Sequence, residues 1–595
     1  MTRPQRLTLW ILSILIAVTR FVPLARAPWD WDEVLFCLAM RDYDVGTHHP
    51  HPPGFPLFIA LANLVRFFTS SDFRALQTVN VVASFFVFPL MFAMARAFRF
   101  SYRTSLVAAI LFAFLPNVWL YGGTAFSDMA ALVLFMLATV LFVDSAPGKA
   151  LDRRRYWLAA FVLGLASLIR PQNALVLIYP WIAAAARFVR AKQYRVIILG
   201  IVITVLVAVI GYGAAMMATG PDRFIGALLG HKDFVARTDT LQNPARPPLG
   251  TIVRMQLDPY VAGKVSILIN LFVLLGMLRG PRRSTIEILL TFAPFFLFMT
   301  FILSHLGFSR LSLSYSPGVV MLAAEGMFAA GVLASRVIRW KPEAIQTGVA
   351  AAALALILGR LIWWTLPAFD EPRRTLAPPT ATVLWIRQHV PKRTTLYVDE
   401  GMWPWARYYL PEYKQIRVPG LRAKDVVDWR EGWFIRPGNS GSVGAVPFRR
   451  PHNRTWNVVA QRYFETYAIP VAEHVYFGKG WYDEESFAEE AWRWMEPEAT
   501  ALLPPVGPNG ELVMAFTVPT HELKKPIRVT FELNGEPLGD VVCRVPTNDV
   551  RFVALNGRTG RPNVLRMTVS DRMIAEGDPR PLALQLHAYG WKPLQ

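Results

Sequence analysis

The sequence is poor in cysteine and comparatively poor in acidic residues. Two cysteines, Cys37 and Cys543, occur among 595 residues and stand near opposite ends of the chain, so they cannot build a disulfide framework or a CxxC metal site. Asp and Glu number 42 against 62 Lys and Arg, which gives a net charge of +20. A charge of this sign suits a nucleic-acid partner or a membrane protein, and the positions of the basic residues decide between the two.

Hydrophobic residues are what the sequence has in abundance. They make up 53% of the chain, aromatic residues make up 13%, and the mean hydropathy is +0.32, which is too apolar for a soluble protein. A segment that crosses the ~30 Å hydrocarbon core needs about 20 apolar residues. The apolar runs predict a polytopic α-helical membrane protein with about eleven transmembrane helices, near 7–24, 76–95, 104–120, 126–143, 156–170, 173–187, 195–218, 264–279, 285–304, 314–335 and 344–366.

Basic residues gather between these predicted spans. With the N-terminus in the cytoplasm, every loop that falls inside is basic, as the positive-inside rule requires. The residues are Arg3, Arg6, Arg96, Arg99, Arg103, Lys149, Arg153, Arg154, Arg155, Arg187, Arg190, Lys192, Arg195, Arg279, Arg282, Arg283, Arg336, Arg339 and Lys341. The positive charge therefore indicates membrane topology, and we expect a lipid bilayer and no nucleic acid as partner.

Two N-terminal segments allow a second interpretation. The stretch 57–68 is apolar but only twelve residues long, and counting it as a span would turn the later basic loops outward. We therefore expect an amphipathic helix in the outer interface, begun by Pro56. The first span, which ends in Ala25-Arg26-Ala27, also fits a cleavable signal peptide. In both cases the chain lies outside from residue 28.

The first outer loop, residues 25–75, contains the motif WDWDEV at 29–34. Its Asp30, Asp32 and Glu33 stand at the start of a short predicted helix, where carboxylates can cap exposed amides. A carboxylate at the rim of a lipid-facing site can instead act as a general base, which takes the proton of a sugar acceptor's hydroxyl. Both interpretations stay open for Asp32, whereas capping is favoured for Asp30.

The arrangement of this loop resembles the GT-C glycosyltransferases. After the acidic motif come a short helix, the turn PHPPGFP at 50–56 and a second interfacial helix, as in the protein O-mannosyltransferases of glycosyltransferase family 39, the aminoarabinose transferases of lipid A and the RgtA/B/C/D-like proteins. The resemblance covers roughly residues 7–366. It implies a GT-C fold, a polyprenyl-phosphate-sugar donor, a glycan, lipid or protein acceptor, inversion at the anomeric carbon, and a catalytic role for Asp32 with Glu33 beside it.

Further residues match the same resemblance. Asp128, in the segment GGTAFSD, corresponds to a second acidic catalytic position, although it could simply cap the helix that follows. Arg170 and Arg310 could each pair with a lipid phosphate, and Arg170 could equally be a snorkelling arginine. In the family, a tyrosine usually follows the arginine that corresponds to Arg310. In this sequence the position is occupied by Leu311. The predicted substrate-binding residues are His49, His51, Arg170, His231, Lys232 and Arg310.

A metal ion is possible but is not indicated by a ligand pattern. His49, His51, Asp30, Asp32 and Glu33 are close in sequence, yet no spacing such as HExxH occurs. The two histidines are better explained as turn residues held by prolines. No cofactor is otherwise predicted. P-loop, GxGxxG and nucleophile-elbow motifs are missing as well, so the use of a nucleotide sugar on the cytoplasmic side has no support.

After residue 367 the long apolar runs cease. We expect the membrane domain to comprise residues 1–367, followed by a small α/β module at 368–475 and a β-sandwich of the jelly-roll type at 476–595, both extracytoplasmic. Asn534-Gly535 between two strand-like runs predicts a hairpin.

Two other classes of protein remain as alternatives. A transporter or flippase of lipid-linked sugars would have the same apolar runs and basic loops, and a non-catalytic scaffold for envelope assembly would depend on the sandwich. The polar residues cluster in the predicted outer segments, and no ionisable residue is expected deep within a span, which favours a catalytic face over a transport path. The predicted location is a bacterial inner membrane.

Overall fold

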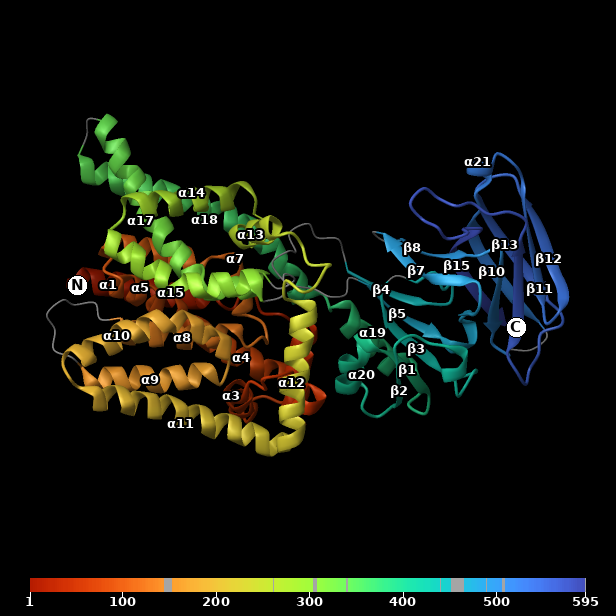
Figure 1. Ribbon diagram of the computed structural model, residues 1–595, viewed down its shortest axis with the longest axis horizontal. Coiled ribbons are helices and arrows are strands. Elements are labelled where there is room, and N and C mark those ends of the chain that lie inside the picture. The colour runs from red at the N-terminus through yellow and green to blue at the C-terminus, as the bar shows by residue number, and fades with distance from the viewer. Residues whose placement is uncertain are drawn as a thin grey trace. The chain divides into compact units, whose positions relative to one another are not determined.

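The structure, a computed structural model, describes residues 1–143, 152–259, 262–302, 308–338, 341–438, 440–450, 465–487, 490–505 and 509–593. The chain divides into two compact units. Of the described residues, the first comprises those from Met1 to Leu376, and the second comprises those from Ala377 onward. In Figure 1 the first unit is helical and the second contains the strands. The protein is thus a helical membrane protein with a C-terminal β-rich region.

The first unit is built from helices that follow one another with short connections. Their bounds are α1 (Arg3–Thr19), α2 (Trp31–Ala39), η1 (Val45–Thr47), α3 (Pro56–Arg66), α4 (Asp72–Phe85), α5 (Val87–Ala97), α6 (Tyr102–Ala113), α7 (Pro116–Tyr121), α8 (Asp128–Phe142), α9 (Arg153–Ser167), η2 (Pro171–Leu177), α10 (Ile178–Arg190), α11 (Tyr194–Thr219), α12 (Pro221–Thr238), α13 (Leu249–Leu257), α14 (Lys264–Arg279), α15 (Arg282–Phe301), α16 (Phe308–Leu311), η4 (Ser312–Ser314), α17 (Ser316–Val337) and α18 (Pro342–Arg374).

All eleven predicted spans fall on helices, but the predicted count is not reached. In the described ranges, four helices are long and apolar enough to cross a membrane: α11, α15, α17 and the helix that begins at Pro342. The pair α4 and α5, bent by 41°, would make a fifth. The other segments form helices such as α1, with 17 residues, and α6, with 12. At about 1.5 Å per residue these are shorter than the ~30 Å core.

The segment predicted as an interfacial helix is α3, which begins at Pro56 as expected. It buries Phe58, Ile59 and Ala62 and exposes Leu64 on its other side. Its helical structure and its two-sided character are therefore as predicted, while its depth in a bilayer stays a prediction.

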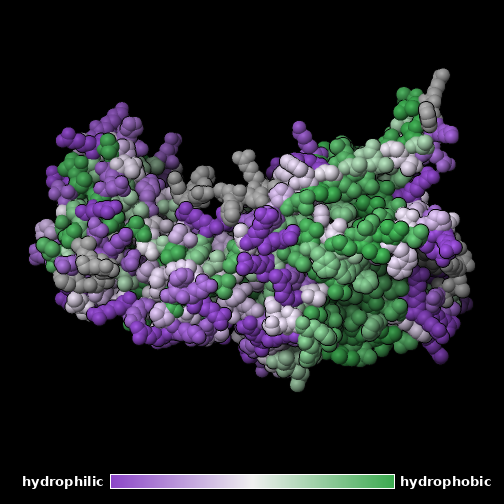
Figure 2. All heavy atoms as spheres, turned by 180° about the vertical axis from the view of Figure 1, so that it is seen from behind, coloured by the Kyte–Doolittle hydropathy of each residue, from purple (hydrophilic) through white to green (hydrophobic). Residues whose placement is uncertain are grey.

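A broad apolar surface covers the first unit. Figure 2 shows hydrophobic side chains spread over one face of it, with hydrophilic side chains at the borders. Exposed apolar residues are most frequent on α11, where they include Ile198, Val202, Leu206, Val209 and Ile210. Water solvates such a surface poorly, whereas the hydrocarbon core of a bilayer covers it without loss.

Glu325 corrects the expectation that no ionisable residue lies deep within a span. It sits near the middle of α17, between the apolar residues Ala324 and Met327. Next to it, α17 and α14 approach so closely that a Cβ atom on Gly276 would lie 2.0 Å from the carbonyl oxygen of Leu322. A Cβ atom on Gly326 would lie 1.8 Å from the carbonyl oxygen of Phe272. Glycine at both positions therefore permits backbone-to-backbone packing.

The second unit has a mixed sheet and two antiparallel sheets. The mixed sheet, in the order β2-β1-β3-β5-β4, is covered by α19 (Pro378–His389) and α20 (Trp403–Tyr409). The strands are β1 (Thr395–Asp399), β2 (Lys414–Val418), β3 (Trp433–Pro437), β4 (Val446–Arg449) and β5 (Glu465–Pro470).

The antiparallel sheets have the orders β13-β10-β15-β8-β7 and β12-β11-β14-β9-β6, and their inner faces share one core. Their strands are β6 (Tyr476–Phe477), β7 (Trp481–Phe487), β8 (Glu490–Met495), β9 (Glu498–Leu503), β10 (Gly510–Thr517), β11 (Ile527–Leu533), β12 (Glu536–Cys543), β13 (Thr547–Ala554), β14 (Asn563–Val569) and β15 (Leu584–Pro593). The predicted hairpin is confirmed, since Asn534 (φ 58°) and Gly535 (φ 93°) join β11 to β12.

The orientation of the chain can be tested by cysteine labelling. Cys37 and Cys543 are buried, so a membrane-impermeant maleimide should find little background. Arg154 and Thr559 are both exposed. In intact cells we expect Thr559→Cys to react and Arg154→Cys to react only after permeabilisation. Labelling of both positions in intact cells would contradict the predicted orientation.

Candidate active site

The acidic motif of the first loop folds as the start of α2. The Asp30 side chain accepts a hydrogen bond from the backbone amide of Asp32, and the Glu33 carboxylate reaches back to the amide of Asp30, which together form a capping box. Asp30 is therefore a cap, as the sequence favoured. Asp32, in the first turn between these two residues, directs its carboxylate elsewhere.

Glu33 is a buried structural carboxylate. It accepts hydrogen bonds from the backbone amides of Trp29 at 2.7 Å, Asp30 at 3.1 Å and Ala125 at 2.8 Å. Burial raises the pKa of Glu33 to about 7, against the effect of these hydrogen bonds, which lower it. Both oxygens face backbone amides, so Glu33 connects the first loop to the segment before α8. These contacts give Glu33 a structural role, in which it positions the first loop, and its catalytic role stays a prediction.

Asp32 belongs to a buried cluster of alternating charges, which we call the aspartate–arginine cluster and define as Asp32, Arg310, Asp128 and Arg170. Nη1 of Arg310 donates to Oδ2 of Asp32 at 2.7 Å, and its Nε lies 3.7 Å from Oδ2 of Asp128. Nη2 of Arg170 donates to the same oxygen of Asp128 at 2.8 Å. Two carboxylates and two guanidinium groups balance each other, as buried charges require.

Four separate chain segments supply these residues. Asp32 comes from α2, Asp128 from the first turn of α8, Arg170 from the turn between α9 and η2, and Arg310 from α16. The sequence predicted that all four residues lie on the outer side of the membrane, and the structure brings them into contact with one another. Asp128 is paired with arginine, and Ser127 before it makes no capping hydrogen bond, so simple capping does not explain this pair of residues.

Aromatic rings wall the cluster. The guanidinium carbon of Arg310 lies 4.7 Å from the centre of the Phe126 ring, and that of Arg170 lies 5.6 Å from the centre of the Phe55 ring. Burial by itself would lower the pKa of Arg310, but the carboxylates of Asp128 and Asp32 outweigh it and raise the pKa. Arg310 therefore stays charged at any physiological pH.

His51 lies beside the cluster in a neutral state. Its Nδ1 is 3.8 Å from Oδ1 of Asp32, which is too long for a hydrogen bond. Burial is the main cause that lowers the pKa of His51 to about 4, and the nearby Asp32 only partly opposes it. Among the described residues, Nδ1 of His51 has no hydrogen-bond partner. A neutral imidazole here can donate to or accept from a bound sugar.

The other predicted residues stand further out. His49 faces Asp42 at 3.6 Å and bridges to the backbone of Asp44, as expected of a turn residue. His231, on α12, is partly buried, and burial lowers its pKa, with Asp32 among the charges that act on it. Lys232 is exposed, and no ion pair links it to the described residues of the cluster.

A metal site is not formed by the described residues. They contain no group of three or more His, Cys, Asp or Glu side chains placed to hold one ion. The three carboxylates of this stretch have other roles, because Asp30 caps α2, Glu33 binds backbone amides and Asp32 pairs with Arg310.

Three site residues were missed by sequence reasoning. Phe126 and Phe55 supply the aromatic walls, and the hydroxyl of Ser127 accepts a hydrogen bond from Nε of Arg170 at 3.0 Å. Phe126 and Ser127 immediately precede Asp128, so the segment GGTAFSD held a usable indication of them. Phe55 lies within the PHPPGFP turn, but nothing in that pattern indicates which arginine it covers.

Comparison with known proteins identifies the fold. No family model matches the sequence, and no curated protein matches it significantly. The crystal structure of ArnT from Cupriavidus metallidurans bound to undecaprenyl phosphate is similar, with a TM-score of 0.51, 13% identity, and coverage of 73% of this chain and 93% of ArnT. The crystal structure of the same protein in the apo state is similar with a TM-score of 0.49 and 13% identity, and the match covers 72% of this chain and 92% of that one. The oligosaccharyltransferase of Archaeoglobus fulgidus in its apo form is similar with a TM-score of 0.48 and 11% identity, and the match covers 72% of this chain and 69% of that one.

At this level of identity the likeness to ArnT shows a shared fold. The chain therefore has the GT-C fold that its first-loop motif resembles. The aspartate–arginine cluster is the feature of this chain from which its chemistry can be argued.

The buried carboxyl of Glu33 predicts a pH dependence of stability. Its folded pKa of about 7 exceeds the unfolded value of 4.5, so the folded state binds more protons between these two values and loses stability as the pH rises through them. We expect a loss of roughly 3 kcal/mol across this range. In Glu33→Gln this dependence should vanish. Thermal unfolding of the detergent-purified protein between pH 4.5 and 7.5 measures both, and identical profiles would contradict the assignment.

Proposed function

We propose that the protein is an integral-membrane glycosyltransferase that transfers a sugar from a polyprenyl-phosphate-linked donor to an acceptor. The observation that carries this proposal is the aspartate–arginine cluster. A general base and a set of cations are the groups needed for displacement at an anomeric carbon when the leaving group is a phosphate. The cluster supplies both kinds of group within one buried site.

The lipid nature of the donor is supported by the fold. ArnT, which has the same fold, is bound to undecaprenyl phosphate in its crystal structure. The exposed apolar residues of α11 and α3 offer surfaces for a lipid chain in the same unit. The class of the acceptor (glycan, lipid or protein), the extracytoplasmic face and the bacterial inner membrane belong to this proposal as well.

The reaction would use Asp32 as the base. Its carboxylate takes the proton of the acceptor hydroxyl while the hydroxyl oxygen forms a bond to the anomeric carbon. The bond between that carbon and the phosphate oxygen breaks, and the electron pair leaves with the polyprenyl phosphate. Base and leaving group stand on opposite faces of the sugar, so the configuration inverts. The proton passes from Asp32 to solvent or to the released phosphate.

Arg310 would change partners during this cycle. In its pair with Asp32 it lowers the basicity of the carboxylate, since a neighbouring cation favours the ionised form. A donor phosphate would compete for Arg310, whose Nε is buried without a hydrogen-bond acceptor among the described residues. As the guanidinium turns toward phosphate, Asp32 becomes a stronger base. Binding of the donor thereby prepares the base, while Asp128 keeps its ion pair with Arg170.

The role of Asp32 is tested by Asp32→Asn. Asparagine keeps the size of the side chain but cannot accept the proton, so turnover with a polyprenyl-phosphate-sugar donor should fall by roughly 10²–10⁴-fold. Radiolabelled sugar transfer by the purified protein measures this. Asp72→Asn is a matched control, because Asp72 is also buried and paired with arginine, through Arg66 at 3.1 Å.

We expect Asp72→Asn to keep most of its activity, and Glu33→Gln to act mainly through stability. Near wild-type transfer by Asp32→Asn would refute Asp32 as the base. Movement of a lipid-linked sugar across vesicles without any transfer, unaffected by Asp32→Asn, would instead support the alternative of a flippase.

The role of Arg310 is tested by two substitutions. Arg310→Ala should weaken use of the donor by roughly 2–5 kcal/mol, because it removes one partner of a buried charge pair. Arg310→Lys should recover only part of this, since lysine keeps the charge but loses the planar fork. The KM for donor and the maximal rate measure the effect. Arg66→Lys is the matched control, and an equal loss in both lysine variants would reduce Arg310 to a structural role.

A further inference from the structure

A polar cavity lies in the first unit, and none of the residues of the aspartate–arginine cluster lines it. It has a volume of about 930 Å³ and is lined by α1, α5, α6, α14, α17 and α18. Its furthest lining residue on α17, Leu333, is 17 residues beyond Ser316 at the start of that helix, or about 25 Å. In the predicted topology this end of α17 faces the cytoplasm.

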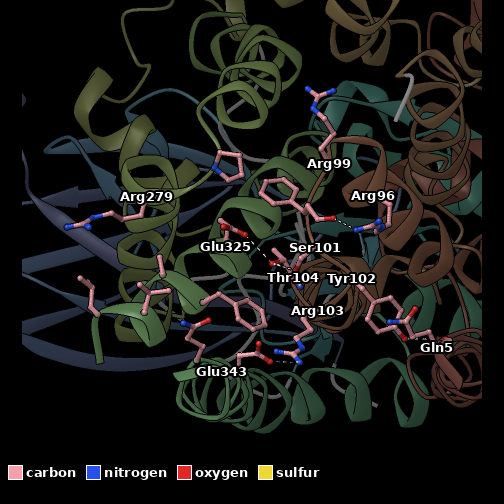
Figure 3. A pocket seen from close by; sticks show the side chains of 17 residues that line it. Gln5, Arg96, Arg99, Ser101, Tyr102, Arg103, Thr104, Arg279, Glu325 and Glu343 are labelled. Carbon is pink, nitrogen blue, oxygen red and sulfur yellow. Dashed lines mark hydrogen bonds and ion pairs between the residues drawn. The ribbon is translucent and has the colours of Figure 1, made fainter. Parts of the chain in front are cut away.

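Arginines surround the cavity. Figure 3 shows Glu325 and Thr104 near its centre, with Arg96, Arg99, Arg103 and Arg279 placed around them. The carboxylates of the lining are those of Glu325 and Glu343. The lining therefore includes four arginines and two glutamates, which gives it a net positive charge.

Two of these arginines are already neutralised by acids. Arg99 is paired with Glu287, and Arg103 lies 3.6 Å from Glu343. Arg96 donates to the backbone carbonyl of Phe100, which fixes its position without neutralising its charge. Arg279 makes no ion pair with a described residue and is exposed. Arg96 and Arg279 therefore hold charge that remains available to an anion.

Glu325 adds a hydrogen-bond acceptor to the floor of the cavity. Its carboxylate accepts a hydrogen bond from the hydroxyl of Thr104 at 3.1 Å. A carboxylate in the middle of an apolar helix is costly unless further donors reach it. Next to it on α17, the apolar residues Phe328, Ala329 and Val332 continue the wall of the cavity.

We propose that this cavity binds the headgroup of an anionic glycerophospholipid. The phosphate diester takes hydrogen bonds from Arg96 and Arg279, a hydroxyl of the headgroup donates to Glu325, and the start of an acyl chain follows the apolar wall on α17. The net positive charge selects an anion, planar guanidinium groups match phosphate oxygens, and the carboxylate selects a headgroup that carries donors. A phosphatidylglycerol headgroup meets all three conditions.

The positive-inside rule alone does not explain why several arginines line this cavity. The positive-inside rule asks only that basic residues lie in the inner loops, at any position. Arg154 and Arg190 meet that condition elsewhere, and both are exposed. At the cavity, Arg96, Arg103 and Arg279, which come from three different helices, instead line one cavity together with Glu325.

Native mass spectrometry of the detergent-purified full chain tests the proposal. Phosphatidylglycerol, phosphatidylethanolamine, phosphatidic acid and inorganic phosphate are titrated separately. We expect phosphatidylglycerol to be retained most strongly and Arg96→Gln/Arg279→Gln to weaken it by about tenfold or more. The charge-matched control Arg154→Gln/Arg190→Gln should bind as wild type does. Glu325→Gln should reduce the preference for phosphatidylglycerol over phosphatidic acid.

The outcomes separate the possibilities. Equal losses in the site variant and its control, or full retention by Arg96→Lys/Arg279→Lys, would mean diffuse charge attraction and overturn the site. Displacement of the lipid by inorganic phosphate at similar concentration, or a preference for phosphatidylethanolamine, would overturn the proposed ligand. A rise in the thermal unfolding midpoint on adding phosphatidylglycerol, lost only in the site variant, would support it. None of these readouts involves sugar transfer.

Discussion

Pairing of buried charge around Arg310 is the constraint on which the first unit depends. A guanidinium group and a carboxylate can leave water only together, because each alone would pay a desolvation penalty of several kcal/mol. Asp32 and Arg310 are 278 positions apart in sequence and 2.7 Å apart in space. Asp128 and Arg170 extend the same requirement to the ends of α8 and α9. Four segments must therefore converge before any of these charges is stable in the interior.

The same constraint makes the site responsive to an anion. The cluster is balanced internally, with Arg310 shared between Asp32 and Asp128. In the proposed reaction, a donor phosphate that draws Arg310 away would break its ion pair with Asp32, and a carboxylate without a neighbouring cation takes up a proton more readily. The ion pair between Arg310 and Asp32 would thus stabilise the empty site, and its loss on donor binding would make Asp32 more basic. Glu33 stays outside this exchange because backbone amides occupy both of its oxygens.

Much of the site could be predicted from the sequence because the topology places it. Asp32, Asp128, Arg170 and Arg310 each stand at the end of an apolar run on the predicted outer side, so helices that pack in parallel bring them together. The capping role of Asp30 could also be predicted, since carboxylates at the start of a helix can cap its exposed amides. What could not be read is the pairing, which depends on side-chain directions set by packing across the unit.

The described helices include fewer candidate spans than the eleven predicted, for a different reason. Hydropathy adds apolar residues without regard to backbone breaks. The chain bends between α4 and α5, leaves the α-helix at Leu115, and runs as a 3-10 helix from Pro171 to Leu177, across the start of the predicted span 173–187. Glu325 was overlooked because a single charge hardly changes the mean of a long apolar window. The other cavity residues Arg96 and Arg279 lie in the last turns of α5 and α14, where the sequence analysis assigned them to topology only.

Helix α17 links the two sites physically. At one end, Asn117 donates to the carbonyl of Ser309 and to the hydroxyl of Ser312, which fixes the short segment that bears Arg310. Further along, Gly326 packs directly against the backbone of α14, so the helix has little freedom to slide. An anion held at the far end of α17 would stabilise the same packing from the other side. The position of Arg310 is thereby set by contacts along a whole helix, and a loop alone could not hold it to the accuracy that pairing with two carboxylates demands.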